Sequence, residues 1–173
     1  MDKAKKVFRN PLFMIAAGAA FGILAKYGDI AYASSIFSYF GLLTSGFAIW
    51  LVIGTAIIYI SSSRKQLSVL LSSFMLPMLL TYYLFSVFVV KYFNIKIALF
   101  WCAAFAGSLI IGNIIFPKRH TRLFVALFII ASAAFVTADA IMINGVNILL
   151  ILCESALCTI TTILISRKIK RKS

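Results

Sequence analysis

The sequence predicts an all-α polytopic membrane protein, a bundle of about six transmembrane helices that forms a single domain over residues 1–173. Two observations predict this fold class. Hydrophobic residues make up 63% of the chain and charged residues 12%, which leaves too little polar surface to cover the core of a soluble domain. The apolar residues also fall in long runs, and about 20 apolar residues allow a helix to cross a bilayer core.

The apolar residues form six runs, and each run predicts one helix. The predicted helices cover residues 12–25, 41–60, 66–90, 97–116, 123–143 and 148–166, and a basic tail follows at 167–173. Only the first run is too short to span without flanking residues. Basic residues before it and Ala31-Tyr32-Ala33 after it also resemble a secretory signal with its cleavage site. Because Lys26 and Asp29 make the stretch before this cut unusually polar, we expect an uncleaved first helix.

The basic residues predict the orientation of the helices. The chain has 17 Lys and Arg but only 4 Asp and Glu, and its formal net charge is +13. In a multi-pass protein, alternate connections between helices lie on the same side of the membrane. One set of connections carries only Lys26, Lys91 and Lys96. The two termini and the other set carry the remaining Lys and Arg residues. Since Lys and Arg are retained on the cytoplasmic side, we expect both termini there and an even number of crossings. Because the basic residues form short clusters between apolar runs, we expect this chain to interact with the lipid bilayer. We do not expect it to bind nucleic acid.

Acidic residues inside the predicted helices are the strongest indication of a binding site. A charge in hydrocarbon costs roughly 2.5–3.5 kcal/mol on insertion scales, so it normally faces a cavity or a partner. Asp139 and Glu154 lie at similar depths near the outer ends of the fifth and sixth helices, which a short turn joins. Asp29 follows the first helix on the same predicted side.

These carboxylates predict an outward-facing polar site between the fifth and sixth helices. The predicted ligand-binding residues are Asp139, Glu154, Asp29, Ser132, Asn147 and Thr161. Such a site suits the binding or transport of a small solute, and a cation or an amine would complement its charge. In the structural alternative, Asp139 meets water and Glu154 pairs with a lysine.

Small residues at four-residue spacing predict faces on which helices approach closely in lipid. These residues are Ala16, Gly18, Ala20 and Gly22 in the first helix and Ala104, Ser108 and Gly112 in the fourth. Such faces either pack within the bundle or dock a membrane-protein partner or a second copy of the chain. Docking predicts the alternative function, an accessory, immunity or assembly subunit of another membrane complex.

The sequence carries no motif of a catalytic or metal centre. His120 is the single histidine, no CxxC occurs among the three cysteines, and neither HExxH, GxSxG nor a phosphate-binding glycine loop is present. We therefore expect no enzymatic activity, no cofactor and no metal. An enzyme that uses Asp139 and Glu154 as an acid/base pair is the third-ranked hypothesis.

Two resemblances add to this interpretation. The run Ser45–Phe85, SGFAIWLVIGTAIIYISSSRKQLSVLLSSFMLPMLLTYYLF, and the preceding Phe21–Asp29, FGILAKYGD, resemble a family of small bacterial membrane proteins of unknown function. This resemblance covers the first three helices and implies a bacterial plasma membrane without implying an activity. The overall architecture is similar to the six-helix substrate-binding subunits of energy-coupling-factor vitamin transporters, a likeness of fold alone.

The predicted topology can be tested by labelling single cysteines in a cysteine-free variant. We expect cysteines at Ser35 and Asn144 to react with an impermeant maleimide from outside intact cells. Cysteines at Ser62 and His120 should react only after the cells are permeabilised, which is the control for their reactivity. A shielded position 144 together with a reactive position 120 in intact cells would contradict the six-helix arrangement.

Overall fold

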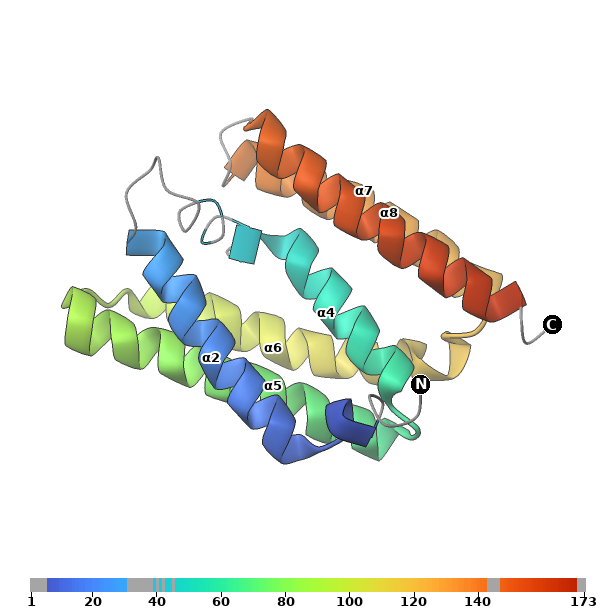
Figure 1. Cartoon of the computed structure of the whole chain (residues 1–173), viewed down its shortest axis with the longest axis horizontal. Helices are drawn as coiled ribbons and strands as arrows, with labels where there is room; N and C mark the ends of the chain where they lie inside the picture. The colour runs from blue at the N-terminus through green and yellow to red at the C-terminus, as the bar shows by residue number, and fades with distance from the viewer. Residues whose placement is uncertain are drawn as a thin grey trace.

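The structure is a computed structural model that describes residues 6–30, 39, 41, 43–44, 46–142 and 147–170. Regular structure in these ranges is helical throughout, without a strand, which confirms the predicted all-α fold class for the described residues. The helices are α2 (Pro11–Ile30), α4 (Phe47–Ile60), α5 (Arg64–Phe85), α6 (Ile95–Ile115), α7 (Arg122–Met142) and α8 (Ile148–Lys170). A π-helical segment, η1 (Ser86–Val90), follows α5, and a 3-10 turn, η2 (Phe116–Lys118), follows α6 (Figure 1).

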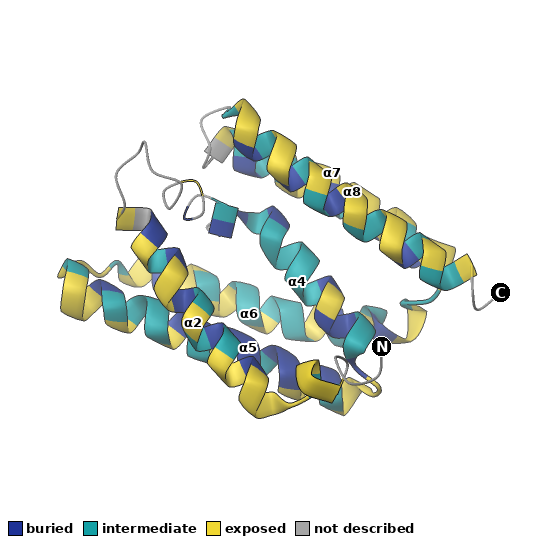
Figure 2. Ribbon diagram, in the orientation of Figure 1, coloured by how far each residue is buried: buried dark blue, intermediate teal, exposed yellow. Residues whose placement is uncertain are grey.

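Within the described residues, five helices are long and apolar enough to cross a membrane: α2, α5 with η1, α6 with η2, α7 and α8. α4 is as apolar but has only 14 residues. Large hydrophobic side chains cover the outward faces that Figure 2 shows as exposed. Those more than 60% exposed are Leu12, Leu80, Phe88, Leu99, Ile110, Ile114, Ile130, Ile141 and Ile148. Such a surface is typical of a helical membrane protein, because lipid covers it.

Two helices are longer than the sequence predicted. α2 has 20 residues and needs no flanking segment to span. Lys26 lies within it, and its ammonium nitrogen is 4.8 Å from the centroid of the Tyr82 ring, a cation–π contact. α8 continues to Lys170, into the predicted tail, because basic side chains stabilise the negative C-terminal end of a helix.

Polar side chains mark several helix starts. The Ser63 hydroxyl oxygen accepts a hydrogen bond from the Gln66 backbone N–H at 3.1 Å at the start of α5. The Asn94 side-chain oxygen accepts one from Lys96 N–H at 3.0 Å at the start of α6. These bonds satisfy backbone donors that the first turn of a helix leaves without partners.

The helices run alternately between two ends of the molecule (Figure 1). The start of α2, the α4–α5 and α6–α7 connections and the end of α8 lie at one end, which we call the basic end. α2 packs along α5, α6 packs on α5, and α7 pairs with α8. α4 lies between these two groups and contacts α5 and α6 as well as α7 and α8.

Gly18 and Gly22 bring α2 against the backbone of α5. A Cβ atom at Gly18 would overlap the Phe74 carbonyl oxygen, and one at Gly22 would overlap the Met78 carbonyl oxygen. The Thr81 hydroxyl crosses this contact and donates to the Ala19 carbonyl oxygen at 3.0 Å. The other small residues predicted on this helix, Ala16 and Ala20, are exposed.

Replacing Gly18 by Ala should therefore destabilise the protein. In an ordinary helix Gly→Ala stabilises by about 0.5–1 kcal/mol, but forcing a methyl group into a packed contact costs about 1–3 kcal/mol. We expect a lower melting temperature in mild detergent for Gly18→Ala. Ala20→Leu is the control, because its larger side chain meets no neighbour and should change stability by less than about 0.5 kcal/mol. A stabilised Gly18→Ala variant would contradict the close helix contact.

Candidate binding site

An apolar cavity of about 540 Å³, which we call the chamber, lies between α4, α5, α6 and α7 and is partly open at the surface, where Phe100 and Ile111 are exposed. This volume is within the range of about 300–1,000 Å³ that small-molecule sites occupy. Among the described residues its lining has no charged side chain, and only Thr55 and Ser108 contribute hydroxyl groups to it. The chamber exists because α6 packs on α5 whereas α7 packs on α8, and only α4 bridges the two groups extensively.

Small residues on two helices form the walls of this chamber. A Cβ atom at Gly54 on α4 or at Gly107 on α6 would meet nothing within 4 Å. The small residues that the sequence predicted as a helix-contact face on α6 also line the chamber; they are Ala104, Ser108 and Gly112. On α6 the missing side-chain volume therefore leaves open space, whereas on α2 it permits a close contact between helices.

Aromatic rings gather around Phe47, at the end of the chamber farther from the basic end. The Phe47 ring centroid lies 6.0 Å from those of Phe100, Trp101 and Phe135. Trp50 joins the group, with its ring 5.9 Å from that of Trp101. The indole N–H of Trp50 is buried and donates to no group among the described residues. This end of the chamber offers flat aromatic faces.

Asp139 lies beyond Phe47 and caps the N-terminus of α4. Its carboxylate accepts hydrogen bonds from Phe47 N–H at 2.8 Å and from Ala48 N–H at 2.9 Å. Its side chain is 0% exposed. A carboxylate at this position satisfies two backbone donors and complements the positive end of the helix dipole. The side chain belongs to α7, so this cap connects two helices that are far apart in the sequence.

Glu154 on α8 approaches the same helix end and is also 0% exposed. A Cβ atom at Gly46 would lie 2.9 Å from Asp139 Oδ2 and 2.9 Å from Glu154 Oε1, so these oxygens are at most twice that distance apart. A side chain at position 46 would have to displace these carboxylate oxygens. The two carboxylates that the sequence singled out therefore do meet, and they do so in the interior.

The other predicted ligand-binding residues lie apart from this pair or support their own helices. Ser132 is buried beside the Cys158 thiol, two turns of α7 from Asp139. The Asn147 side-chain oxygen accepts from Leu149 N–H at 3.1 Å and caps α8. The Thr161 hydroxyl donates to the Leu157 carbonyl oxygen at 2.8 Å. The Asp29 side chain lies outside the described residues.

The chamber is the feature that sequence reasoning missed. In the sequence, its lining residues are indistinguishable from ordinary residues of apolar helices; among them are Trp50, Gly54, Trp101 and Gly107. A glycine that faces a cavity has the same sequence pattern as a glycine that faces a neighbouring helix. For metal binding, the described residues hold no group of three His, Cys, Asp or Glu side chains that could coordinate an ion.

Comparison with known proteins adds no family to this description. No family model, no curated protein and no solved structure matches the chain. The two resemblances drawn from the sequence therefore stay predictions, and function must be argued from the site itself.

Removing the Asp139 carboxylate should destabilise the protein. A buried charge is itself costly, but Asp139→Ala leaves two backbone N–H groups of α4 without an acceptor, which costs about 1–3 kcal/mol. We expect a lower melting temperature for Asp139→Ala and an intermediate one for Asp139→Asn, whose amide oxygen still accepts one bond. Thr137→Ala on the exposed side of α7 is the control and should melt like wild type. Equal or greater stability of Asp139→Ala would show that the cap does not hold α4.

Proposed function

We propose that this chain is a six-helix protein of the bacterial plasma membrane, with both termini in the cytoplasm, that binds a small apolar or amphipathic molecule. The observation that carries the proposal is the chamber of about 540 Å³ between α4, α5, α6 and α7. The proposal keeps the small-solute role predicted from the sequence. It places the body of the ligand in the chamber instead of between α7 and α8.

Shape and aromatic contacts would provide the affinity. Lipid tails are as apolar as the chamber wall, so burial of apolar surface alone gives little preference over the surrounding bilayer. The rings of Phe47, Trp50 and Trp101 offer faces for stacking or for a ligand cation. These rings favour a ligand with a flat or cationic part.

The carboxylate pair would act indirectly in this proposal. Phe47 lines the chamber, and its backbone N–H binds Asp139. Asp139, with Glu154 beside it, holds the start of α4 and therefore the position of the aromatic rings. A cationic ligand would also gain from the negative charge behind Phe47, which keeps the predicted preference for cations.

Two other functions remain as alternatives. An accessory subunit would dock through the outward face of α2, where Ala16 and Ala20 are exposed. Phe13 and Tyr27 are also exposed on this helix, but two aromatic rings do not identify a partner, so the chamber supports the stronger proposal. Transport would require a second opening of the chamber, and catalysis would require a reactive group on its wall.

Intrinsic fluorescence can test the proposal, because the chain has only two tryptophans, Trp50 and Trp101, and both line the chamber. The probe is 4-bromophenethylamine, which has the flat and cationic parts that the proposal favours and whose bromine atom quenches tryptophan on contact. We expect saturable quenching of the purified protein in detergent. Gly107→Leu should raise the half-quenching concentration at least tenfold, because the new side chain occupies the space that the probe needs.

Ala106→Leu is the matched control, because Ala106 precedes Gly107 on α6 and is exposed. It should bind the probe like wild type. Non-saturable quenching that is equal in all three proteins would contradict a ligand site. A Gly107→Leu variant that melts higher and quenches like wild type would instead identify the chamber as a packing void.

A further inference from the structure

The exposed part of the chamber wall lies on two helices. The residues that line the chamber from α4 and α5 are buried or half-buried. On α6, Phe100 and Ile111 line the chamber and are 50% and 58% exposed, and on α7 Phe135 lines it and is 38% exposed. α6 and α7 make almost no direct contact with each other. The chamber therefore opens between these two helices, and we call the opening bordered by Phe100, Ile111 and Phe135 the slot.

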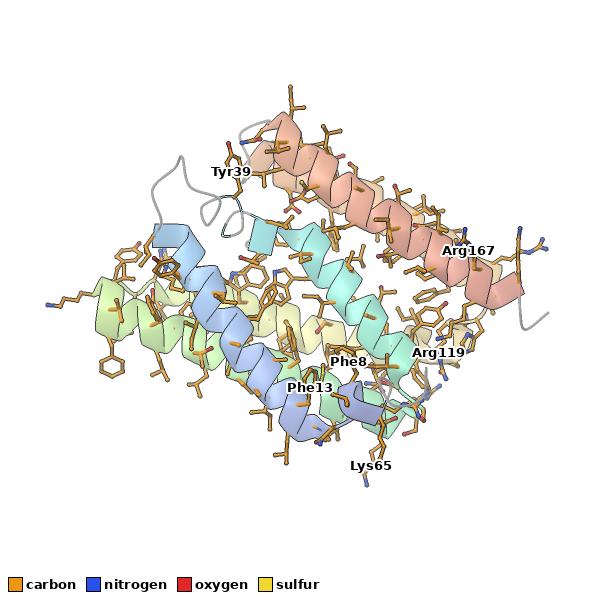
Figure 3. The ribbon with its side chains drawn as sticks, in the orientation of Figure 1. Phe8, Phe13, Tyr39, Lys65, Arg119 and Arg167 are labelled. Atoms are coloured by element: carbon orange, nitrogen blue, oxygen red, sulfur yellow. The ribbon has the colours of Figure 1, made fainter. Side chains whose placement is uncertain are left out.

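The slot lies midway between the two ends of the molecule. Figure 3 shows Lys65 and Arg119 at the basic end and Tyr39 near the opposite end. α6 runs between these ends; its 21 residues make it about 31 Å long, and Phe100 and Ile111 lie roughly 6–8 Å from its two ends. The hydrocarbon core of a bilayer is about 30 Å thick. In a bilayer that α6 spans, the slot therefore faces acyl chains.

Buried residues border the chamber toward both ends of α4. Toward the basic end these are Ile58 and Leu67, which are 6% and 0% exposed. Toward the opposite end, Phe47 lines the chamber and its backbone N–H binds the fully buried carboxylate of Asp139. Within the described residues, the route from the surface into the chamber is therefore the slot.

We propose that the slot admits the hydrocarbon chain of an amphiphile dissolved in the bilayer, so that the chamber receives its ligand laterally from the lipid. Phe100 and Ile111 border the slot over about 16 Å along α6, and an extended hydrocarbon chain fits an apolar opening of this length. A polar solute would first have to leave water for hydrocarbon, which is costly. The inference rests on the proposed function and narrows its ligand to molecules that partition into the bilayer.

Trp50 on α4 can report a hydrocarbon chain in the chamber, because it lines the chamber and is the single tryptophan left after Trp101→Phe. The experiment measures the fluorescence of this parent variant in phosphatidylcholine vesicles with and without bromine atoms in the middle of one acyl chain. We expect the brominated vesicles to quench Trp50. Adding Ala131→Phe should abolish most of this quenching, because Ala131 lines the chamber one turn before Phe135 and a ring there obstructs the slot.

Ala133→Phe is the matched control, because Ala133 is exposed on the same helix and is not part of the chamber wall. It should be quenched like the parent. Phe135→Ala should be quenched more than the parent, because it widens the slot, and it serves if Ala131→Phe does not fold. Equal quenching of the parent, Ala131→Phe and Phe135→Ala would overturn the lateral route, and so would an unquenched parent.

The binding of 4-bromophenethylamine to the wild type in detergent separates this inference from the proposed function. If the amine quenches saturably but the brominated vesicles quench the parent and the slot variants equally, the chamber is a ligand site and the lateral route is wrong. If neither the amine nor the brominated vesicles quench, both the ligand site and the route are refuted.

Discussion

The hydrogen bonds from the first N–H groups of α4 to Asp139 determine much of the surrounding arrangement. α4 has only 14 residues, and side chains of opposite charge hold its two ends. Asp139 binds its N-terminus, and Arg9 and Lys168 bind its C-terminal carbonyl groups. Each contact complements the helix dipole. A short helix held in this way can separate α5 and α6 from α7 and leave a chamber beside it.

Glycine has opposite consequences on the two sides of the molecule. Gly18 and Gly22 remove side chains where α2 meets the backbone of α5, which produces the most extensive helix contact in the described structure. Gly54 and Gly107 remove side chains where no neighbour fills the space. The first pair contributes packing within the bundle, and the second pair contributes volume to the chamber. Stability and the proposed binding function thus depend on different glycines.

Charge is separated along α4 as well as along the whole molecule. The buried carboxylates of Asp139 and Glu154 lie at one end of this helix, and Arg9 and Lys168 lie at the other. The apolar chamber lies between them, lined by aromatic rings near the acidic end. A ligand in the chamber would therefore lie beside α4, between the two oppositely charged ends of this helix.

Composition and the length of the apolar runs were enough to predict the all-helical class, because a helix in lipid must satisfy its own backbone hydrogen bonds. They also identified Asp139 and Glu154 as neighbours, because a short turn joins the two helices. The sequence could not show that these carboxylates face the N-terminus of α4, more than ninety residues earlier in the chain. It also could not distinguish the glycines that contact a helix from those that border a cavity. Both questions depend on which helices become neighbours, and only the tertiary structure decides that.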